Sequence, residues 1–280
     1  MPGTLHGLWK ARRPLSATSS VENRDMPAEE YAAAPQLPQR PLLREILARD
    51  APAMLAAAIA TIALLLGVFF LTRARTGEPN ASLAALAAGA AWVALAGSVL
   101  AAGGRTWLPA VLRGGIVADA SGVALVVIWL LSPHVTFVAA IKIYCIYTAC
   151  ALLGVAAVCC ARTAAGKYAA AVLAAAAIML VLASPFWAGG IVRAAGRNAG
   201  PAIAAAAVHA NPFYSITAAV FEQTHFSWNT APVMYNEVQQ IGSPAPRWYS
   251  AAAIHATAAV LLAAIALMRQ PERSPLTDRK

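Results

Sequence analysis

Charge is what this chain of 280 residues has least of, since only 12% of its residues are Asp, Glu, Lys or Arg. A soluble domain carries about 25% charged residues. The chain is 60% hydrophobic with a mean hydropathy of +0.62, and no polar stretch in it is large enough to bury a core of its own. This composition excludes an ordinary water-soluble globular domain.

Cysteine is scarce too, and Cys145, Cys150, Cys159 and Cys160 all lie in one apolar run. They form no CxxC pair and no histidine cluster accompanies them, so neither a metal site nor a disulfide framework is predicted. A phosphate-binding loop is also missing, because the segment 161–168 lacks the first Gly and the final Ser or Thr of that motif. No metal ion or nucleotide is therefore expected to bind the chain directly, and any ATP-driven function would need a separate ATPase.

Long apolar runs are what the chain does have. Each is about as long as the ~20 residues that an α-helix needs to cross a bilayer. They lie at 52–72, 81–103, 114–131, 135–160, 168–189 and 250–268. The sequence therefore predicts an all-α integral membrane protein with six transmembrane helices.

Polar segments flank these runs. Residues 1–40 are rich in Pro, Ala and charge, which predicts a disordered cytoplasmic tail before a transmembrane domain at 41–280. The start of the chain has no short apolar stretch with a cleavage site, so the first helix is expected to act as an uncleaved signal-anchor. Residues 190–249 are predicted to form an outer region between the fifth and sixth helices.

The basic residues predict an orientation. Cytoplasmic loops carry an excess of Lys and Arg. With six helices and both termini inside, fifteen of the 21 basic residues lie inside, which favours this N-in, C-in arrangement. The stretch 200–221 could be re-entrant or a seventh span, and we prefer a re-entrant or interfacial element because it contains His209, Asn211 and Pro212.

A short amphipathic segment precedes the first span. Pro41 opens the stretch 42–50, and proline suits the first turn of a helix. Leu43, Ile46 and Leu47 fall on one face, whereas Arg44 falls on the other. This pattern is typical of a helix that lies in the membrane interface, so an N-terminal interfacial helix is predicted.

Two charged residues lie inside the predicted spans. Asp119 is in the third and Lys142 in the fourth, at similar depth, so an intramembrane ion pair between them is one hypothesis. Displacement of the Asp119 side chain toward the inner interface is a second hypothesis, and a proton relay is a third. Ser121 in the third span and His255 in the last leave open an intramembrane serine protease, which would need the two side chains within hydrogen-bond reach.

The outer region carries a resemblance. Asn211-Pro212-Phe213 interrupts the chain after the fifth span, Pro244, Pro246 and Trp248 precede the last span, and the tail 269–280 is basic. This order, with the interfacial helix and six spans, resembles the membrane subunit of an ABC-2-type exporter. In that family an outer re-entrant helical element, with a break such as Asn211-Pro212-Phe213, lies between the fifth and sixth helices.

The resemblance implies a permease of the bacterial plasma (inner) membrane that pairs with a second copy or a sister permease. A separate cytoplasmic ABC subunit would bind and hydrolyse ATP, so this chain would itself be non-catalytic and would bind no cofactor directly. Nucleic acid is not an expected partner, and a membrane scaffold or sensor remains an alternative. The expected docking surface for the ATPase consists of Leu43, Arg44, Ile46, Leu47, Arg105, Trp107 and Arg113.

Overall fold

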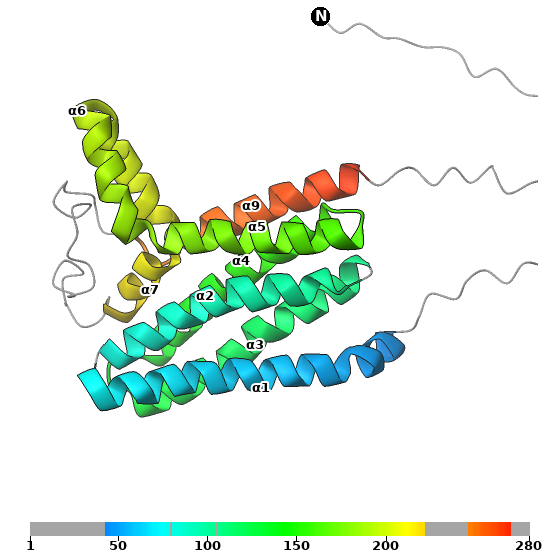
Figure 1. Cartoon of the computed structure of the whole chain (residues 1–280). Coiled ribbons are helices and arrows are strands. Elements are labelled where there is room, and N and C mark those ends of the chain that lie inside the picture. The colour runs from blue at the N-terminus through cyan, green and yellow to red at the C-terminus, as the bar shows by residue number, and fades with distance from the viewer. Residues whose placement is uncertain (1–42, 79, 105, 222–245, 270–280) are drawn as a thin grey trace, which may run out of the picture. The chain divides into compact units, whose positions relative to one another are not determined.

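The computed structural model describes residues 43–78, 80–104, 106–221 and 246–269, and these ranges contain helices and no strand (Figure 1). The helices are α1 (Leu43–Thr76), α2 (Asn80–Ala102), α3 (Trp107–Leu131), α4 (Phe137–Cys159), α5 (Ala164–Leu182), α6 (Ser184–Ala210), α7 (Pro212–Phe221) and α9 (Ser250–Met268).

Six of these helices are long and apolar enough to cross a membrane, which confirms the predicted class of an all-α, multi-pass membrane protein. They are α1 from Ala48 onward, α2, α3, α4, α5 and α9. Each overlaps one of the six predicted runs. The bent pair formed by α6 and α7 would add a seventh crossing only if the two together made one broken span.

The six spans differ in the fraction of their residues that is buried inside the bundle. About half of α2 and α4 is buried, because α2 packs against α1, α3, α4 and α5, while α4 packs against α2, α3, α5 and α9. Only 17% of the most apolar part of α1, α5 or α9 is buried. The interior therefore forms around α2, α3 and α4, and the other three spans lie at the edge.

Small residues allow the central helices to approach closely. Ala90, Ala94 and Ser98, three small residues spaced four apart on α2, are completely buried. A Cβ atom on Gly154 of α4 would lie 3.0 Å from the Cβ of Ser98, so only glycine fits at this crossing. Close backbone approach of this kind is how membrane helices gain van der Waals contact without a hydrophobic driving force.

The helix predicted at 42–50 is present from Leu43, and it continues into the first span. The interfacial helix expected at 42–50 is not a separate element, because α1 is continuous from Leu43 to Thr76 with Pro52 inside it. Proline removes one backbone hydrogen bond and bends a helix without having to end it. Figure 1 shows the first turns of α1 bent relative to its straight remainder.

The fifth span ends earlier than predicted. The apolar run extends to residue 189, but α5 stops at Leu182 and α6 begins at Ser184. Ala183 leaves helical geometry, and Pro185 lies in the first turn of α6, where its missing N–H has no helical partner to lose. Phe186 and Trp187 therefore belong to α6 and not to the span.

Helix α6 folds back on itself. Its backbone is non-helical at Gly196, where φ is +67°, a region that favours glycine. A Cβ atom on Gly200 would lie 2.9 Å from the carbonyl oxygen of Val192, so the two halves of α6 lie against each other beside the turn. Figure 1 shows α6 leaving the end of α5 and returning toward α7.

After this hairpin the chain turns again. The axes of α6 and α7 differ by 71°, with the break at Asn211. α7 packs against α2 and α4 and is buried along almost its whole length. We call the end of the bundle that carries α6 and α7 the hairpin end. The opposite end, formed by the start of α1, the α2–α3 and α4–α5 connections and the end of α9, is the basic end.

Candidate functional site

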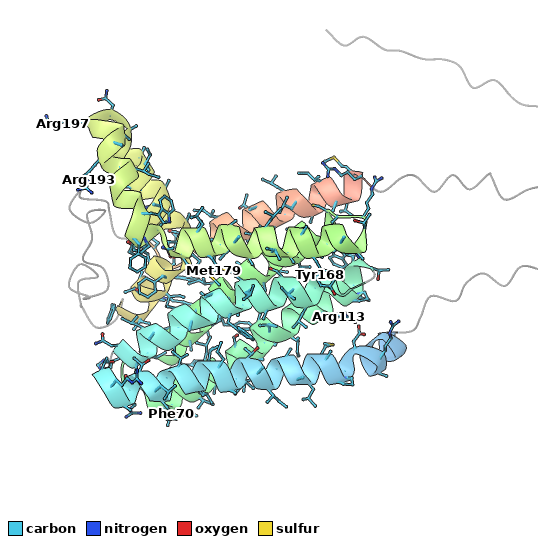
Figure 2. The ribbon with its side chains drawn as sticks, in the orientation of Figure 1. Phe70, Arg113, Tyr168, Met179, Arg193 and Arg197 are labelled. Carbon is cyan, nitrogen blue, oxygen red and sulfur yellow. The ribbon has the colours of Figure 1, made fainter. Side chains whose placement is uncertain are left out.

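An ion pair joins α1 to α3 at the basic end. The Arg113 guanidinium donates from Nε to Asp50 Oδ2 at 2.8 Å and from Nη2 to Asp50 Oδ1 at 2.6 Å. Asp50 is buried and Arg113 is half-buried. A two-pronged pair of this kind fixes the relative orientation of its partners as well as their distance. Figure 2 shows Arg113 at the end of the bundle where α1 begins.

The α2–α3 connection is held in the same place. A Cβ atom on Gly104 would lie 2.6 Å from the backbone nitrogen of Ala110, so the connection passes against α3 at a distance that only glycine allows. Lys167 Nζ, from the first turn of α5, donates to the Gly104 carbonyl oxygen at 2.7 Å. Three spans thus meet at this short connection.

The α4–α5 connection reaches α9 at the same end. Cys160 Sγ donates to the Leu262 carbonyl oxygen at 3.2 Å, and Arg162 donates to the Arg269 carbonyl oxygen. Cationic side chains suit the carboxyl end of a helix, where the helix dipole is negative. The connections at the basic end are therefore tied to the spans beside them.

Some of the residues predicted to dock an ATPase are described, and these lie at the basic end. Trp107 begins α3 and is 58% exposed. Arg113 faces α1 and pairs with Asp50, so it holds two helices together instead of standing free for a partner. The side chains of Leu43, Arg44, Ile46 and Leu47 lie outside the described residues, although their backbone is helical, and Arg105 lies outside them as well.

The Asp119–Lys142 pair is not formed in the structure. Asp119 Oδ1 accepts a hydrogen bond of 2.6 Å from the Tyr144 hydroxyl, whereas the Lys142 ammonium lies 5.4 Å from the centre of the Trp248 ring. Asp119 keeps its place in the middle of α3, so the displacement toward the interface is not seen either. Asp119 lies twelve residues from either end of α3, whereas Lys142 lies five residues after the start of α4, and the two side chains face different neighbours.

Ser121 and His255 are likewise not brought together. Ser121 Oγ donates to the Val117 carbonyl oxygen at 2.8 Å, and His255 Nδ1 donates to the Ala251 carbonyl oxygen at 2.7 Å. Both side chains are buried, and each satisfies a backbone carbonyl of its own helix, as hydroxyls in apolar helices commonly do. The protease hypothesis requires a serine–histidine hydrogen bond that this geometry lacks.

Asn211 organises the break at the hairpin end. Its Nδ2 donates to the Val181 carbonyl oxygen and to Ser184 Oγ, both at 2.9 Å, while its Oδ1 accepts from the Phe213 backbone N–H at 2.8 Å. The side chain thus caps the first turn of α7 and satisfies the end of α5. The Asn211-Pro212-Phe213 break expected after the fifth span is present, and Asn211 and Phe213 are buried.

Aromatic and basic residues precede the last span, as the sequence indicates. Arg247 Nη1 donates to the Tyr249 hydroxyl at 2.7 Å, which raises the pKa of Arg247 further above its ordinary value. Trp248 packs against the bundle interior, directly before α9 begins. Pro246 is buried, and Pro244 lies outside the described residues.

The sequence did not predict a polar cluster that lies at the hairpin end, around Glu78. Glu78 Oε2 accepts hydrogen bonds from Ser82 Oγ at 3.1 Å and Ser132 Oγ at 2.9 Å, and Arg73 Nε lies 3.9 Å from Glu78 Oε1. The cluster ties the α1–α2 turn to the α3–α4 connection. The available signal was that Glu78 is the only acidic residue between the first two predicted spans.

Compared with known proteins, the chain matches no family model, no curated protein and no solved structure. Within the described residues, no three His, Cys, Asp or Glu side chains gather in a way that could hold a metal ion. The fold and the contacts at its two ends are therefore what any functional proposal has to use.

Proposed function

We propose that this chain is the membrane-spanning permease subunit of an ATP-driven exporter of the ABC-2 type, and that a separate subunit hydrolyses the ATP. One observation carries the proposal: a helical hairpin and a break at Asn211 stand between the fifth and the last span, at the end opposite the basic connections. The resemblance drawn from the sequence requires an element of this kind at this position.

The basic end suits the transmission of force from an ATPase. The start of α1 and the α2–α3 connection are the two elements expected to touch that subunit, and the Asp50–Arg113 pair joins α1 to α3 beside them. Because the pair has two short hydrogen bonds, a push on either element moves both helices together. The Lys167 bond to Gly104 extends this link to α5.

The position of α7 at the hairpin end suits it to control where a transported substrate leaves the protein. α7 packs against α2 and α4, the two most enclosed spans, and also contacts α9. A movement of these spans relative to one another would displace α7, since α7 is buried among them and held at its first turn by Asn211. In the proposed transporter α7 is the element that covers the path until the spans move.

An enzyme is less well supported. The intramembrane protease hypothesis needs Ser121 and His255 to share a hydrogen bond, and each instead donates to its own helix. No contact among the described residues favours the scaffold or sensor hypothesis over the transporter.

The test is to purify the full chain from its own membranes and to identify what accompanies it. We expect an ABC-type ATP-binding protein to co-purify, and we expect Trp107→Ala to weaken this association. Phe186→Ala is the matched control, because Phe186 is an exposed aromatic residue at the hairpin end. Absence of any ATP-binding protein, or equal effects of the two variants, would contradict the proposal.

A further inference from the structure

Glu78 is an acidic residue whose side chain is largely buried at the hairpin end of the bundle. It lies in the α1–α2 turn, and its side chain is 15% exposed. Among the described residues, its Oε1 is the one buried side-chain oxygen or nitrogen that has no hydrogen-bond partner. An ionised carboxylate is costly to bury unless its oxygens are paired or hydrogen-bonded, so the unpartnered oxygen calls for a physical explanation.

The second oxygen of this carboxyl group belongs to a closed triangle of oxygen atoms. Glu78 Oε2 lies 3.1 Å from Ser82 Oγ and 2.9 Å from Ser132 Oγ, and the two hydroxyl oxygens lie 2.9 Å apart. Ser82 is completely buried and Ser132 is 4% exposed. A hydroxyl group has one hydrogen to donate. When both hydroxyls donate to an ionised Glu78, the short contact between them contains no hydrogen, whereas a hydrogen on Oε2 supplies the one that is missing.

The position of Arg73 is a second, independent observation. Its Nε lies 3.9 Å from Glu78 Oε1, while its Nη1 donates to the Leu131 carbonyl oxygen at 3.3 Å. A guanidinium beside an ionised carboxylate frequently makes two short hydrogen bonds, as Arg113 and Asp50 do at the basic end. The Arg73 side chain is 44% exposed and has room to move. Its distance from Glu78 is therefore what a neutral carboxyl group would produce.

We propose that Glu78 holds a proton in this arrangement and that it is an acid-responsive latch between the α1–α2 turn and the α3–α4 connection. The carboxyl O–H donates to Ser132, Ser132 donates to Ser82, and Ser82 donates back to Glu78 Oε2, so each contact of the triangle contains one hydrogen. The latch opens by simple acid dissociation. The O–H bond breaks, its electron pair stays on the carboxylate, and the proton passes to water at the hairpin end.

Loss of the proton changes the contacts between two parts of the chain. Both hydroxyls then donate to Glu78, so the contact between Ser82 and Ser132 loses its hydrogen and opens. The new negative charge attracts Arg73, which turns from the Leu131 carbonyl oxygen toward Glu78 Oε1. Each change removes a bond between the α1–α2 turn and the end of α3 or the connection that follows it. The latch is thus closed by acid and loosened by base.

Few other ionisable residues belong to the elements around Glu78. α1 contributes Arg73 and the exposed Arg75, and α2 contains none. The α3–α4 connection contributes His134, and the adjoining turns of α3 and α4 contain none. α7, which also packs against α2, contains only Tyr214. Because His134 titrates as well, a response to pH has to be compared between chains that differ only at residue 78.

Infrared spectroscopy of the full chain in lipid bilayers tests the proton directly. A protonated carboxyl group has a C=O stretching band that an ionised carboxylate lacks, and this band shifts in heavy water. At neutral pH we expect Glu78→Gln to lose such a band relative to the unsubstituted chain. Asp119→Asn is the matched control, because Asp119 also accepts a hydroxyl hydrogen bond, and it should leave the Glu78 band in place. Loss of carboxylate bands in Glu78→Gln would overturn the proposal.

Spin labelling tests the latch. The label is placed on Pro133→Cys, an exposed position beside Ser132, in a chain whose four native cysteines are replaced by alanine. We expect the mobile fraction of the label to increase between neutral and alkaline pH. Glu78→Gln in the same chain should abolish this increase, because the amide keeps a donor and has no proton to release.

Equal increases with Glu78 and with Gln would assign the response to other groups such as His134 and overturn the latch. A label that does not respond in either chain would overturn it as well. Neither experiment involves an ATPase or a substrate, so the inference does not depend on the proposed transport function.

Discussion

Most hydroxyl groups of the spans satisfy a carbonyl of their own helix, and only a few side chains bond to a neighbouring helix. Thr61, Ser98 and Ser121 each donate to the carbonyl four residues earlier. By contrast, the Tyr147 hydroxyl donates to the Leu86 carbonyl oxygen of α2 at 2.7 Å, and Trp92 Nε1 donates to Thr61 Oγ1 at 2.9 Å. Where apolar packing is uniform, these few bonds specify which helix faces meet.

Tyr147→Phe tests the first of these bonds. The variant leaves the Leu86 carbonyl without its side-chain donor in a completely buried place, so we expect a loss of about 1–2 kcal/mol of stability. Thermal denaturation of the purified protein in detergent measures it. Tyr168→Phe is the control, since Tyr168 is half exposed at the start of α5. Equal transition temperatures for the two variants would argue against the role of this bond.

The Asp50–Arg113 pair is tested by a double-mutant cycle. Asp50→Asn and Arg113→Gln each leave one charge without its partner, so we expect each to cost about 2 kcal/mol. The double variant should cost clearly less than the sum, because the two residues interact directly. Unfolding in detergent provides the measurement, and Arg49→Gln is the exposed control beside the pair. Additive effects would mean that the two charges act separately.

The sequence identified the charged residues inside the spans, but it did not predict which side chains they contact. Depth along a helix follows from residue number, so Asp119 and Lys142 could be placed at similar levels. The direction of each side chain depends on helix rotation, and residues 142 and 144 point about 200° apart around α4. Tyr144 faces Asp119, whereas Lys142 lies over Trp248. The predicted topology places both Asp50 and Arg113 near the inner interface, but nothing in the sequence indicates that they form an ion pair.

At the scale of single helices, the hairpin α6 depends on two glycines and one asparagine. Gly196 adopts a positive φ at the turn, Gly200 lies against the Val192 carbonyl, and Asn211 ends the element. Figure 2 shows Arg193 and Arg197 at the tip of α6, away from the other helices. The contacts that hold the hairpin therefore lie at its base and beside its turn, and the base is where Asn211 acts.

Asn211→Ala should loosen the base of the hairpin. The substitution removes the cap of α7, worth about 1 kcal/mol, together with the bonds to Val181 and Ser184. We expect faster cleavage by trypsin after Arg193 and Arg197, which are exposed. Asn198→Ala is the control because Asn198 is also exposed, near the tip. Unchanged cleavage in Asn211→Ala would show that other contacts hold the hairpin.

The bounds of the individual helices show which elements could be predicted from the sequence. Six runs of sufficient length and apolarity gave six spans, since both properties are local. The end of α5 could not be read in this way, because residues 183–189 carry no charge and include Phe186 and Trp187, so that Ser184 and Pro185 are the only marks of the turn. The continuity of α1 was also hidden, since a proline such as Pro52 can either begin a helix or bend one.

At the scale of the whole molecule, the described basic side chains other than Lys142, which lies inside α4, divide evenly between the two ends of the bundle. Arg49, Arg113, Arg162, Lys167 and Arg269 belong to the basic end, whereas Arg73, Arg75, Arg193, Arg197 and Arg247 belong to the hairpin end. The excess that predicts orientation therefore comes from basic residues whose side chains are not described, chiefly Lys10, Arg12, Arg13, Arg24 and Arg40 before α1 and Arg44 in its first turn. Orientation is then decided by the sequence that precedes the first span.

Reporter fusions test this orientation directly. A fluorescent protein fused after Lys280 should be fluorescent, and alkaline phosphatase inserted after Arg197 should be active, because the first requires the cytoplasm and the second requires the far side of the membrane. Substituting Gln for Lys10, Arg12, Arg13, Arg24, Arg40 and Arg44 lowers the number of basic residues on the inner side from fifteen to nine, against five on the outer side. Both signals should therefore fall as part of the population inverts. The matched control substitutes Gln for Arg73, Arg75 and Arg193, which increases the asymmetry and should leave both signals unchanged. An active phosphatase after Lys280 in the unsubstituted chain would place the basic end on the far side, where no ATPase could reach Trp107.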